Sequence, residues 1–339
     1  SRSCVTTLTT HSLVARRLAS VSLAGRLEGL TCTTASTGGW TLTTVKKENG
    51  ARLSTLPENE IYLLDVWQEH LDAINQYGVQ MEEDGSFQTY DNLKACRHAY
   101  EIGPVDLAIM FVKSTMTKQA MVDNKALLKE STMVLTLQNG LGNVDAICEV
   151  VPQNHVLAGT TAHGATMLGP GRMKHAGTGK TVIGELSGEV TERVKGIADM
   201  FNRACLLTET SDNAIGLIWG KLLSNVGLNA ITAITGLLNG QILDYPETEE
   251  LMTLAVLEAK AVADAKGVKL SYDDAVEHTR ALCKATAPNR SSMLQDISNK
   301  RKTEIDMING AIVREGRALG IPTPINLALT NLIKTIEQK

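Results

Sequence analysis

The sequence predicts an α/β fold with a parallel sheet, followed by an all-helical domain. Between residues 60 and 203, short apolar runs alternate with segments of helical periodicity. Beyond about residue 211 the strand signals end and long helical periods take over. The first pattern is typical of βαβ units that build a parallel sheet, and the second of a helical bundle.

Each expected element follows from a local pattern. Apolar runs bounded by turn residues predict strands at 60–66, 106–112, 131–137, 156–161 and 181–184. Helical periodicity predicts helices at 68–77, 117–128, 144–151, 190–203, 212–236, 246–267, 271–284, 300–319 and 325–337. Gly78 ends the first helix, and Pro322 and Pro324 separate the last two.

Composition excludes several classes of protein. The chain has 339 residues, of which 43% are hydrophobic and 21% charged, so a sizeable core is available. A net charge of −4 and 4% aromatic residues argue against a nucleic-acid partner. No run approaches the ~18 apolar residues of a membrane span. The six cysteines form no CxxC motif and have no His pair beside them, so we expect neither a disulfide scaffold nor a metal site.

Residues 1–47 differ from the rest of the chain. They contain eleven Thr, six Ser and six basic residues but only one acidic residue, Glu28. Three interpretations stay open: a transit-like presequence, a disordered arm, or sequence outside the native reading frame. We accordingly expect a cytoplasmic protein, or an organellar one if this segment is a presequence.

One helix of the second half carries a polar face. Lys221, Asn225 and Asn229 are spaced i, i+4, i+8, which places them about 40° apart on one side of the helix. This face offers an ammonium and two amides. Reduction of a ketone needs a nearby cation or acid, because charge develops on the carbonyl oxygen. The alternative is a solvated lysine with two surface amides.

Four sequence blocks, in order, resemble the ketopantoate reductase family from about residue 60 to the C-terminus. They are LQNGLG at 137–142, WGK at 219–221 followed by Asn225 and Asn229, NRSSMLQD at 289–296, and TEID at 303–306 followed by Asn309 and Gly310. The resemblance implies a Rossmann-like domain for NADP(H) at 59–210 and a helical substrate and catalytic domain at 211–339, with residues 1–58 apart. It also implies reduction of 2-dehydropantoate to pantoate in pantothenate biosynthesis.

The resemblance also assigns roles to individual residues. It implies that Lys221 is the acid and that Glu304 assists it and contacts the substrate. Asn225 and Asn229 would bind the substrate, and Ser292 would contact its carboxylate. Ser292 has a competing interpretation as the N-cap of the following helix.

Three residues are expected at the coenzyme. The resemblance implies that Asn139 approaches the nicotinamide and the substrate, and that Lys113 lies near the coenzyme. Asp65 ends the strand at 60–66, where an acidic residue hydrogen-bonds the adenosine ribose and favours NAD(H). No Arg or Lys follows in Asp65-Val66-Trp67, whereas NADP(H) enzymes tend to place Arg there. The resemblance makes NADP(H) the expected coenzyme, and Asp65 makes NAD(H) the alternative.

The dinucleotide fingerprint G-x-G-x-x-G is missing. It should stand roughly 20 residues before Asp65, near residues 30–50. Gly38-Gly39 does not match it, and no apolar strand leads into it. Two explanations stay open: the first 58 residues are not native sequence, or this member has lost the usual coenzyme binding. No residue of 1–58 is therefore expected to bind coenzyme.

The competing functions are a NAD-dependent D-2-hydroxyacid dehydrogenase of the same family, a non-catalytic relative, and a 3-hydroxyacid or 6-phosphogluconate-type dehydrogenase. The expected partner is a small 2-keto acid, with no nucleic acid and no membrane, and a homodimer is an alternative to a monomer. His163 and His175 are interpreted as structural, because no residue that would orient either ring can be named.

Overall fold

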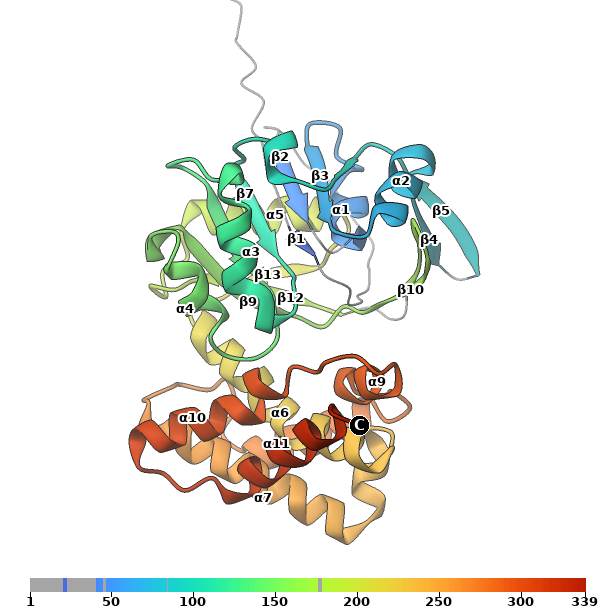
Figure 1. Ribbon diagram of the computed structural model, residues 1–339. Helices are drawn as coiled ribbons and strands as arrows, with labels where there is room; N and C mark the ends of the chain where they lie inside the picture. The colour runs from blue at the N-terminus through green and yellow to red at the C-terminus, as the bar shows by residue number, and fades with distance from the viewer. Residues whose placement is uncertain (1–20, 23–40, 45–46, 84, 176–178) are drawn as a thin grey trace, which may run out of the picture.

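A computed structural model describes residues 21–22, 41–44, 47–83, 85–175 and 179–339. The chain forms an α/β part up to residue 210 and a helical part beyond it, and helix α6 runs from one part into the other (Figure 1). This confirms the expected fold class. The interpretations of residues 1–47 fall almost wholly outside the described residues.

The main sheet has the strand order β1-β3-β2-β7-β8-β9-β12-β13, with β6 also paired to β3. Its strands are β1 (Val21–Ser22), β2 (Thr41–Thr44), β3 (Glu60–Asp65), β6 (Lys94–Cys96), β7 (Leu107–Met110), β8 (Met133–Thr136), β9 (Val156–Thr161), β12 (Thr181–Glu185) and β13 (Thr208–Thr210). The strands from β3 to β9 are parallel, whereas β12 runs antiparallel to β9. Both β7 and β8 are buried along their whole length, which explains why every residue of β7 and all but Thr136 of β8 are apolar.

An interior position of this sheet, between β3 and β7, is occupied by β2, a strand that the sequence did not predict. Thr41–Thr44 pairs with β3 on one side and with β7 on the other, both in parallel. Three of its four residues are Thr, so it carries no apolar run. A β-branched residue nevertheless suits an extended backbone, and pairing on both sides holds the strand in place.

A second, four-stranded sheet has the order β10-β11-β4-β5. It consists of β4 (Val79–Glu83), β5 (Ser86–Tyr90), β10 (Ala165–Gly169) and β11 (Arg172–His175). None of these four strands was predicted. For β5 the reason is that the strand is largely exposed and lacks an apolar face. A turn at 169–171 joins β10 to β11.

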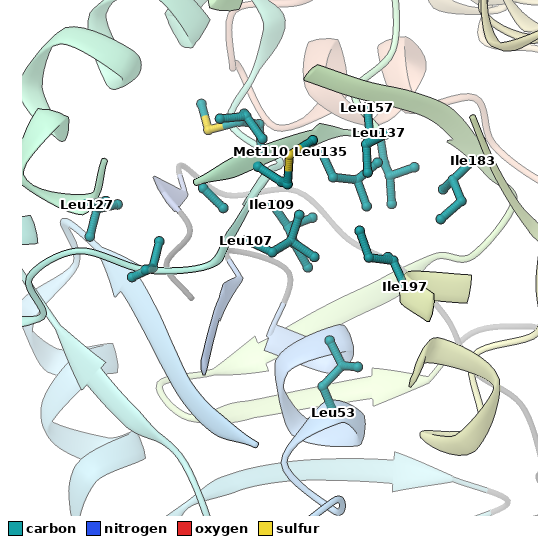
Figure 2. Packing of buried hydrophobic residues seen from close by; sticks show 14 of the residues in the cluster. Leu53, Leu107, Ile109, Met110, Leu127, Leu135, Leu137, Leu157, Ile183 and Ile197 are labelled. Atoms are coloured by element: carbon teal, nitrogen blue, oxygen red, sulfur yellow. The ribbon is translucent and has the colours of Figure 1, made fainter. Parts of the chain in front are cut away.

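The core of the α/β part lies between the main sheet and its helices. The helices are α1 (Lys47–Leu53), α2 (Gln68–Tyr77), α3 (Thr117–Asp123), α4 (Asn143–Cys148) and α5 (Glu192–Arg203), with short 3-10 turns η1 (Ala99–Glu101), η2 (Ser114–Met116), η3 (Lys125–Leu127) and η4 (Gln153–His155). Figure 2 shows Leu107 and Ile109 of β7 in the same cluster as Leu53 of α1 and Ile197 of α5. The predicted helix at 68–77 is confirmed residue for residue.

The helical part is built around α6 (Ala214–Thr235). Its other elements are η5 (Gly240–Asp244), α7 (Pro246–Ala265), α8 (Ala275–Ala285), α9 (Ser292–Ser298), η6 (Ile305–Met307), α10 (Asn309–Leu319) and α11 (Pro324–Ile336). The expected helix at 300–319 is wrong in its first half, since η6 and a break at Ile308 precede α10. By length and composition α6 is apolar enough to cross a membrane, but 72% of its most apolar window is buried inside the protein.

Candidate active site

Lys221 is anchored where the two parts meet. It projects from α6, and its Nζ donates a hydrogen bond of 2.7 Å to the carbonyl of Thr161, the last residue of β9. Burial lowers the pKa of Lys221 to about 8, although the negative charge of Glu304 opposes this by raising it. The ammonium can therefore release its proton close to neutral pH.

Glu304 is anchored separately from Lys221. Its Oε1 accepts a hydrogen bond of 2.9 Å from the backbone N–H of Ser114 and lies 2.9 Å from the Ser114 hydroxyl. Ser114 follows β7 and is 3% exposed, while Glu304 precedes η6 in the helical part. This contact ties the predicted carboxylate to the carboxyl edge of the sheet, where ligands bind in α/β folds.

A buried network supports Ser114 from behind. The Ser114 hydroxyl also approaches the carbonyl of Asn139, and Asn143 Nδ2 donates to both the Ser114 hydroxyl (3.2 Å) and that carbonyl (2.9 Å). Thr117 donates to Asn143 Oδ1 at 2.7 Å, and Gln138 Nε2 donates to Thr117 at 2.8 Å. The predicted Asn139 thus shares a network with Glu304.

The loop that carries Asn139 packs directly on the helical part. The N–H of Leu141 donates to the carbonyl of Met307 at 2.9 Å. Gly140 has a φ of +81°, and a Cβ atom there would lie 2.5 Å from the same carbonyl. Only glycine combines this backbone conformation with so close an approach.

Lys113 lies beside this network but contacts protein. Its Nζ forms an ion pair with Asp296 of α9 and donates to the carbonyl of Lys302 at 2.8 Å. The cation expected at the coenzyme therefore joins the α/β part to the helical part.

Of the residues expected to bind the substrate, only some lie on the same helix face as Lys221. Asn225 is half-buried and Asn229 is 5% exposed, on the α6 face that also carries Lys221. Ser292 is exposed at the start of α9. Its alternative role as an N-cap is wrong, because the neighbouring Ser291 accepts the capping bond from Leu294 N at 3.0 Å.

Asp65 lies apart from Lys221 and Glu304. It ends β3, which β2 and β7 separate from β8, so it stands roughly 14 Å from the Asn139 loop at about 4.8 Å per strand. Its Oδ1 accepts a 3.0 Å hydrogen bond from the N–H of Trp67. Of the two histidines, His163 is buried, and His175 lies 3.6 Å from Glu83.

The carboxyl edge of the main sheet, from Asp65 at the end of β3 to the Asn139 loop after β8, fits a dinucleotide at its two ends better than in its middle. Asp65 suits a ribose at one end, and the Asn139 loop suits a nicotinamide at the other. In the middle, the sequence from β2 into α1 reads Thr44-Val45-Lys46-Lys47 and offers no glycine for a turn that would approach a pyrophosphate. In addition, Val21 and Ser22 pair with Leu64 and Asp65, immediately beyond the last β2–β3 pair, in the place where a pyrophosphate would lie. The middle of the edge does not fit the coenzyme.

A cavity of about 180 Å³ also lies between the two parts. Its lining includes Gln138, Gly142, Ile218 and Trp219, together with the ion pair of Lys266 and Glu315. None of the residues predicted for the site contributes to this lining.

Sequence reasoning missed three groups near the site. Ser114 is a lone serine after a strand, and the Thr161 acceptor is a backbone carbonyl, so neither leaves a signal in the sequence. Arg97 follows β6, and its Nη1 donates to the carbonyl of Val66 at 3.0 Å and to Gln68 Oε1 at 3.3 Å. No Arg or Lys directly follows Asp65 in the sequence, but the guanidinium of Arg97 reaches the turn after Asp65 from the end of β6.

Comparison with known proteins identifies the family. The family model described as "Ketopantoate reductase PanE/ApbA" matches residues 49–188, and the model of its C-terminal domain matches residues 213–337. The 2-dehydropantoate 2-reductase of Halobacterium salinarum is 34% identical over 283 residues, which are 83% of this chain and 92% of the relative.

Solved structures agree. The crystal structure of a PanE/ApbA family ketopantoate reductase from Ralstonia eutropha superposes with a TM-score of 0.80 at 32% identity, covering 94% of this chain and 98% of the other. A ternary structure of D-mandelate dehydrogenase with NADH and anilino(oxo)acetate has the same TM-score and coverage at 28% identity. Members of the family are oxidoreductases that act on CH–OH groups. The four sequence blocks, the two-part fold and these matches together show that the chain belongs to the ketopantoate reductase family.

Proposed function

We propose that this chain reduces a small 2-keto acid, with 2-dehydropantoate as the first candidate substrate and (R)-pantoate as the product. The observation that carries the proposal is that Lys221 and Glu304 are both held at the carboxyl edge of the sheet, Lys221 by Thr161 and Glu304 by Ser114, with the charge of Glu304 acting on Lys221. The α/β part, residues 59–210 together with strand β2 of its sheet and helix α1, would serve the coenzyme. The helical part, residues 211–339, would serve the substrate.

Lys221 has the properties of the proton donor. Reduction turns the carbonyl oxygen into a hydroxyl, so that oxygen must receive a proton as negative charge develops on it. A lysine whose pKa is lowered to about 8 by burial gives up this proton more readily than an ordinary lysine. Thr161 O holds the ammonium at 2.7 Å and so fixes its position before the substrate arrives.

The amides and hydroxyls nearby suit the rest of a 2-keto acid. Asn225 and Asn229 follow Lys221 on the same helix face and can bind the polar groups of the substrate. Ser292 lies exposed at the first turn of α9, where a carboxylate would also meet free backbone N–H groups. Glu304 can accept a hydrogen bond from a substrate hydroxyl.

For the coenzyme, NADP(H) is the proposed choice and NAD(H) the alternative. Arg97 supports NADP(H), because Cys96 pairs with Leu64 and the next residue along, Arg97, lies across from Asp65. A guanidinium at this place can pair with the adenosine 2′-phosphate. Asp65 supports NAD(H), since a carboxylate there binds the ribose hydroxyls and repels a phosphate.

The first experiment is to follow the oxidation of NADPH, and in parallel of NADH, by the purified 339-residue chain with 2-dehydropantoate. Turnover would support the reaction and identify the coenzyme, and would mean that residues 1–58 supply a nucleotide site of unfamiliar sequence. If neither coenzyme is oxidised and neither binds, the defect lies in the middle of the dinucleotide site, between β2 and α1. If a coenzyme binds without turnover, the proposed substrate is wrong.

The second candidate is a NAD-dependent D-2-hydroxyacid dehydrogenase. Asp65 favours it, and the similar D-mandelate dehydrogenase was solved with NADH. Oxidation of D-mandelate with NAD⁺, faster than reduction of 2-dehydropantoate, would favour this function over the first.

A further inference from the structure

The two opposite charges of the site do not form an ion pair with each other. Lys221 Nζ donates to Thr161 O, and Glu304 Oε1 accepts from Ser114. Among the ion pairs within 4.0 Å in the described part of the chain, none joins Lys221 to Glu304. Still, Glu304 is the charged group that acts on Lys221 through space. Each charge is therefore held by a partner of its own.

From this arrangement, and on the basis of the proposed function, we infer that Ser114 is a positioning residue that holds the Glu304 carboxylate away from Lys221. Glu304 and Lys221 are both half-buried, and their opposite charges attract each other strongly because little water screens them. If they met, the proton donor would be locked in an ion pair and Glu304 would be withdrawn from the substrate. The backbone N–H of Ser114 donates to Glu304 Oε1, and the Ser114 hydroxyl lies 2.9 Å from the same oxygen, so both groups oppose this movement.

The network behind Ser114 defines the position of its hydroxyl. Asn143 Nδ2 donates to the Ser114 oxygen at 3.2 Å, so the single hydroxyl proton is left for Glu304 Oε1 or for Asn139 O. Asn143 is itself held by Thr117 at 2.7 Å and is 4% exposed. A side chain fixed in this way has little freedom to follow Glu304 if the carboxylate moves.

The other charged groups near this pair have their own partners. Lys113 and Asp296 pair with each other beside Ser114, and Arg301 Nε lies 3.5 Å from Asp296. His163 follows Thr161 by two residues and is buried. Glu304 thus remains the charge whose displacement would change the behaviour of Lys221.

The test measures the protonation of Lys221 in the protein without substrate or coenzyme. Competitive labelling with acetic anhydride at a series of pH values, with the Lys221 peptide read by mass spectrometry, gives the pH of half-maximal labelling. Ser114→Ala should raise this pH by about one unit, because Glu304 then keeps only the backbone N–H of residue 114 and its carboxylate can move toward the ammonium. Glu304→Gln should lower it, because the negative charge is gone. Ser114→Thr, which keeps the hydroxyl, should stay near the wild type.

A matched control removes another buried serine hydroxyl. Ser54 is also 3% exposed and donates to Ala51 O at 2.6 Å, away from Lys221. Ser54→Ala should leave the labelling of Lys221 unchanged. An unchanged or lowered midpoint in folded Ser114→Ala, or an equal rise in Ser54→Ala, would overturn the inference.

A second readout is kinetic. With the substrate that the chain proves to reduce, Ser114→Ala should lower kcat about tenfold while KM for the keto acid stays within about twofold, and Ser114→Thr should restore kcat. A KM effect alone would contradict the inference. Because the labelling uses neither substrate nor coenzyme, its result stands even if the proposed reaction is wrong.

Discussion

The buried ammonium of Lys221 should make the stability of the protein depend on pH. Its pKa falls from 10.5 to about 8 in the folded chain. Below pH 8 the lysine is charged in both the folded and the unfolded state, and the fold bears the full cost of burying the charge. Between pH 8 and 10.5 the folded state has released the proton while the unfolded state keeps it, so stability rises with pH. Above 10.5 both states are neutral and the cost is gone.

The magnitude follows from the size of this window. A difference of about 2.5 pKa units, at about 1.36 kcal/mol each, gives a total cost of about 3 kcal/mol. Lys221→Met removes the titrating group while keeping a similar length. Between pH 7 and pH 9.5 the free energy of unfolding of the wild type should therefore gain about 2 kcal/mol relative to the variant. The lost bond to Thr161 O adds an offset of about 1 kcal/mol that does not change with pH.

Urea unfolding followed by circular dichroism at several pH values between 7 and 9.5 measures this difference. Other groups titrate in the same range, but they do so in both proteins and cancel in the comparison. Lys260→Met, which removes a surface lysine bound to Asp264, supplies the baseline for losing a lysine of α7. A difference between wild type and Lys221→Met that is constant with pH, or that falls as pH rises, would refute the reasoning.

Three further predictions concern activity, coenzyme choice and the loop at the site. Lys221→Ala should lower turnover at least ~10²-fold, as expected when a positioned acid is lost, and near-normal turnover in a steady-state assay would exclude this role. Asp65→Ala should weaken NADH binding more than NADPH binding in fluorescence titrations, and Arg97→Ala should do the reverse; equal effects on both coenzymes would remove these residues from coenzyme selection. Gly140→Ala should lower the free energy of unfolding by about 2 kcal/mol or more, because the new Cβ meets Met307 O. Gly236→Ala is its control, with a φ of +80° but nothing within 4 Å, and an equal loss in both variants would argue against the clash.

The fold class could be predicted because local pattern and burial agree. Strand β7 is apolar throughout and β8 up to Thr136, since helices cover both faces of a parallel sheet. The helix at 68–77 was predicted with both its ends, because glycine commonly terminates a helix. In the structure Gly78 does so with a φ of 73°. By contrast, β2 and β5 carry no apolar run, and only pairing with their neighbours makes them strands.

The candidate site divides in the same way. Lys221, Asn225 and Asn229 could be placed on one face from their spacing alone, because a helix converts sequence distance into direction. Only the tertiary structure brought Ser114 to Glu304 over 190 residues, Arg97 to the turn after Asp65, and Lys113 to Asp296 over 183 residues. The sequence by itself therefore determined the apolar strands, most of the helices, the family and the chemical groups that these elements carry. Which of these groups meet was decided by how the α/β and helical parts pack, because hydrogen bonds between distant segments depend on positions in space that no local pattern encodes.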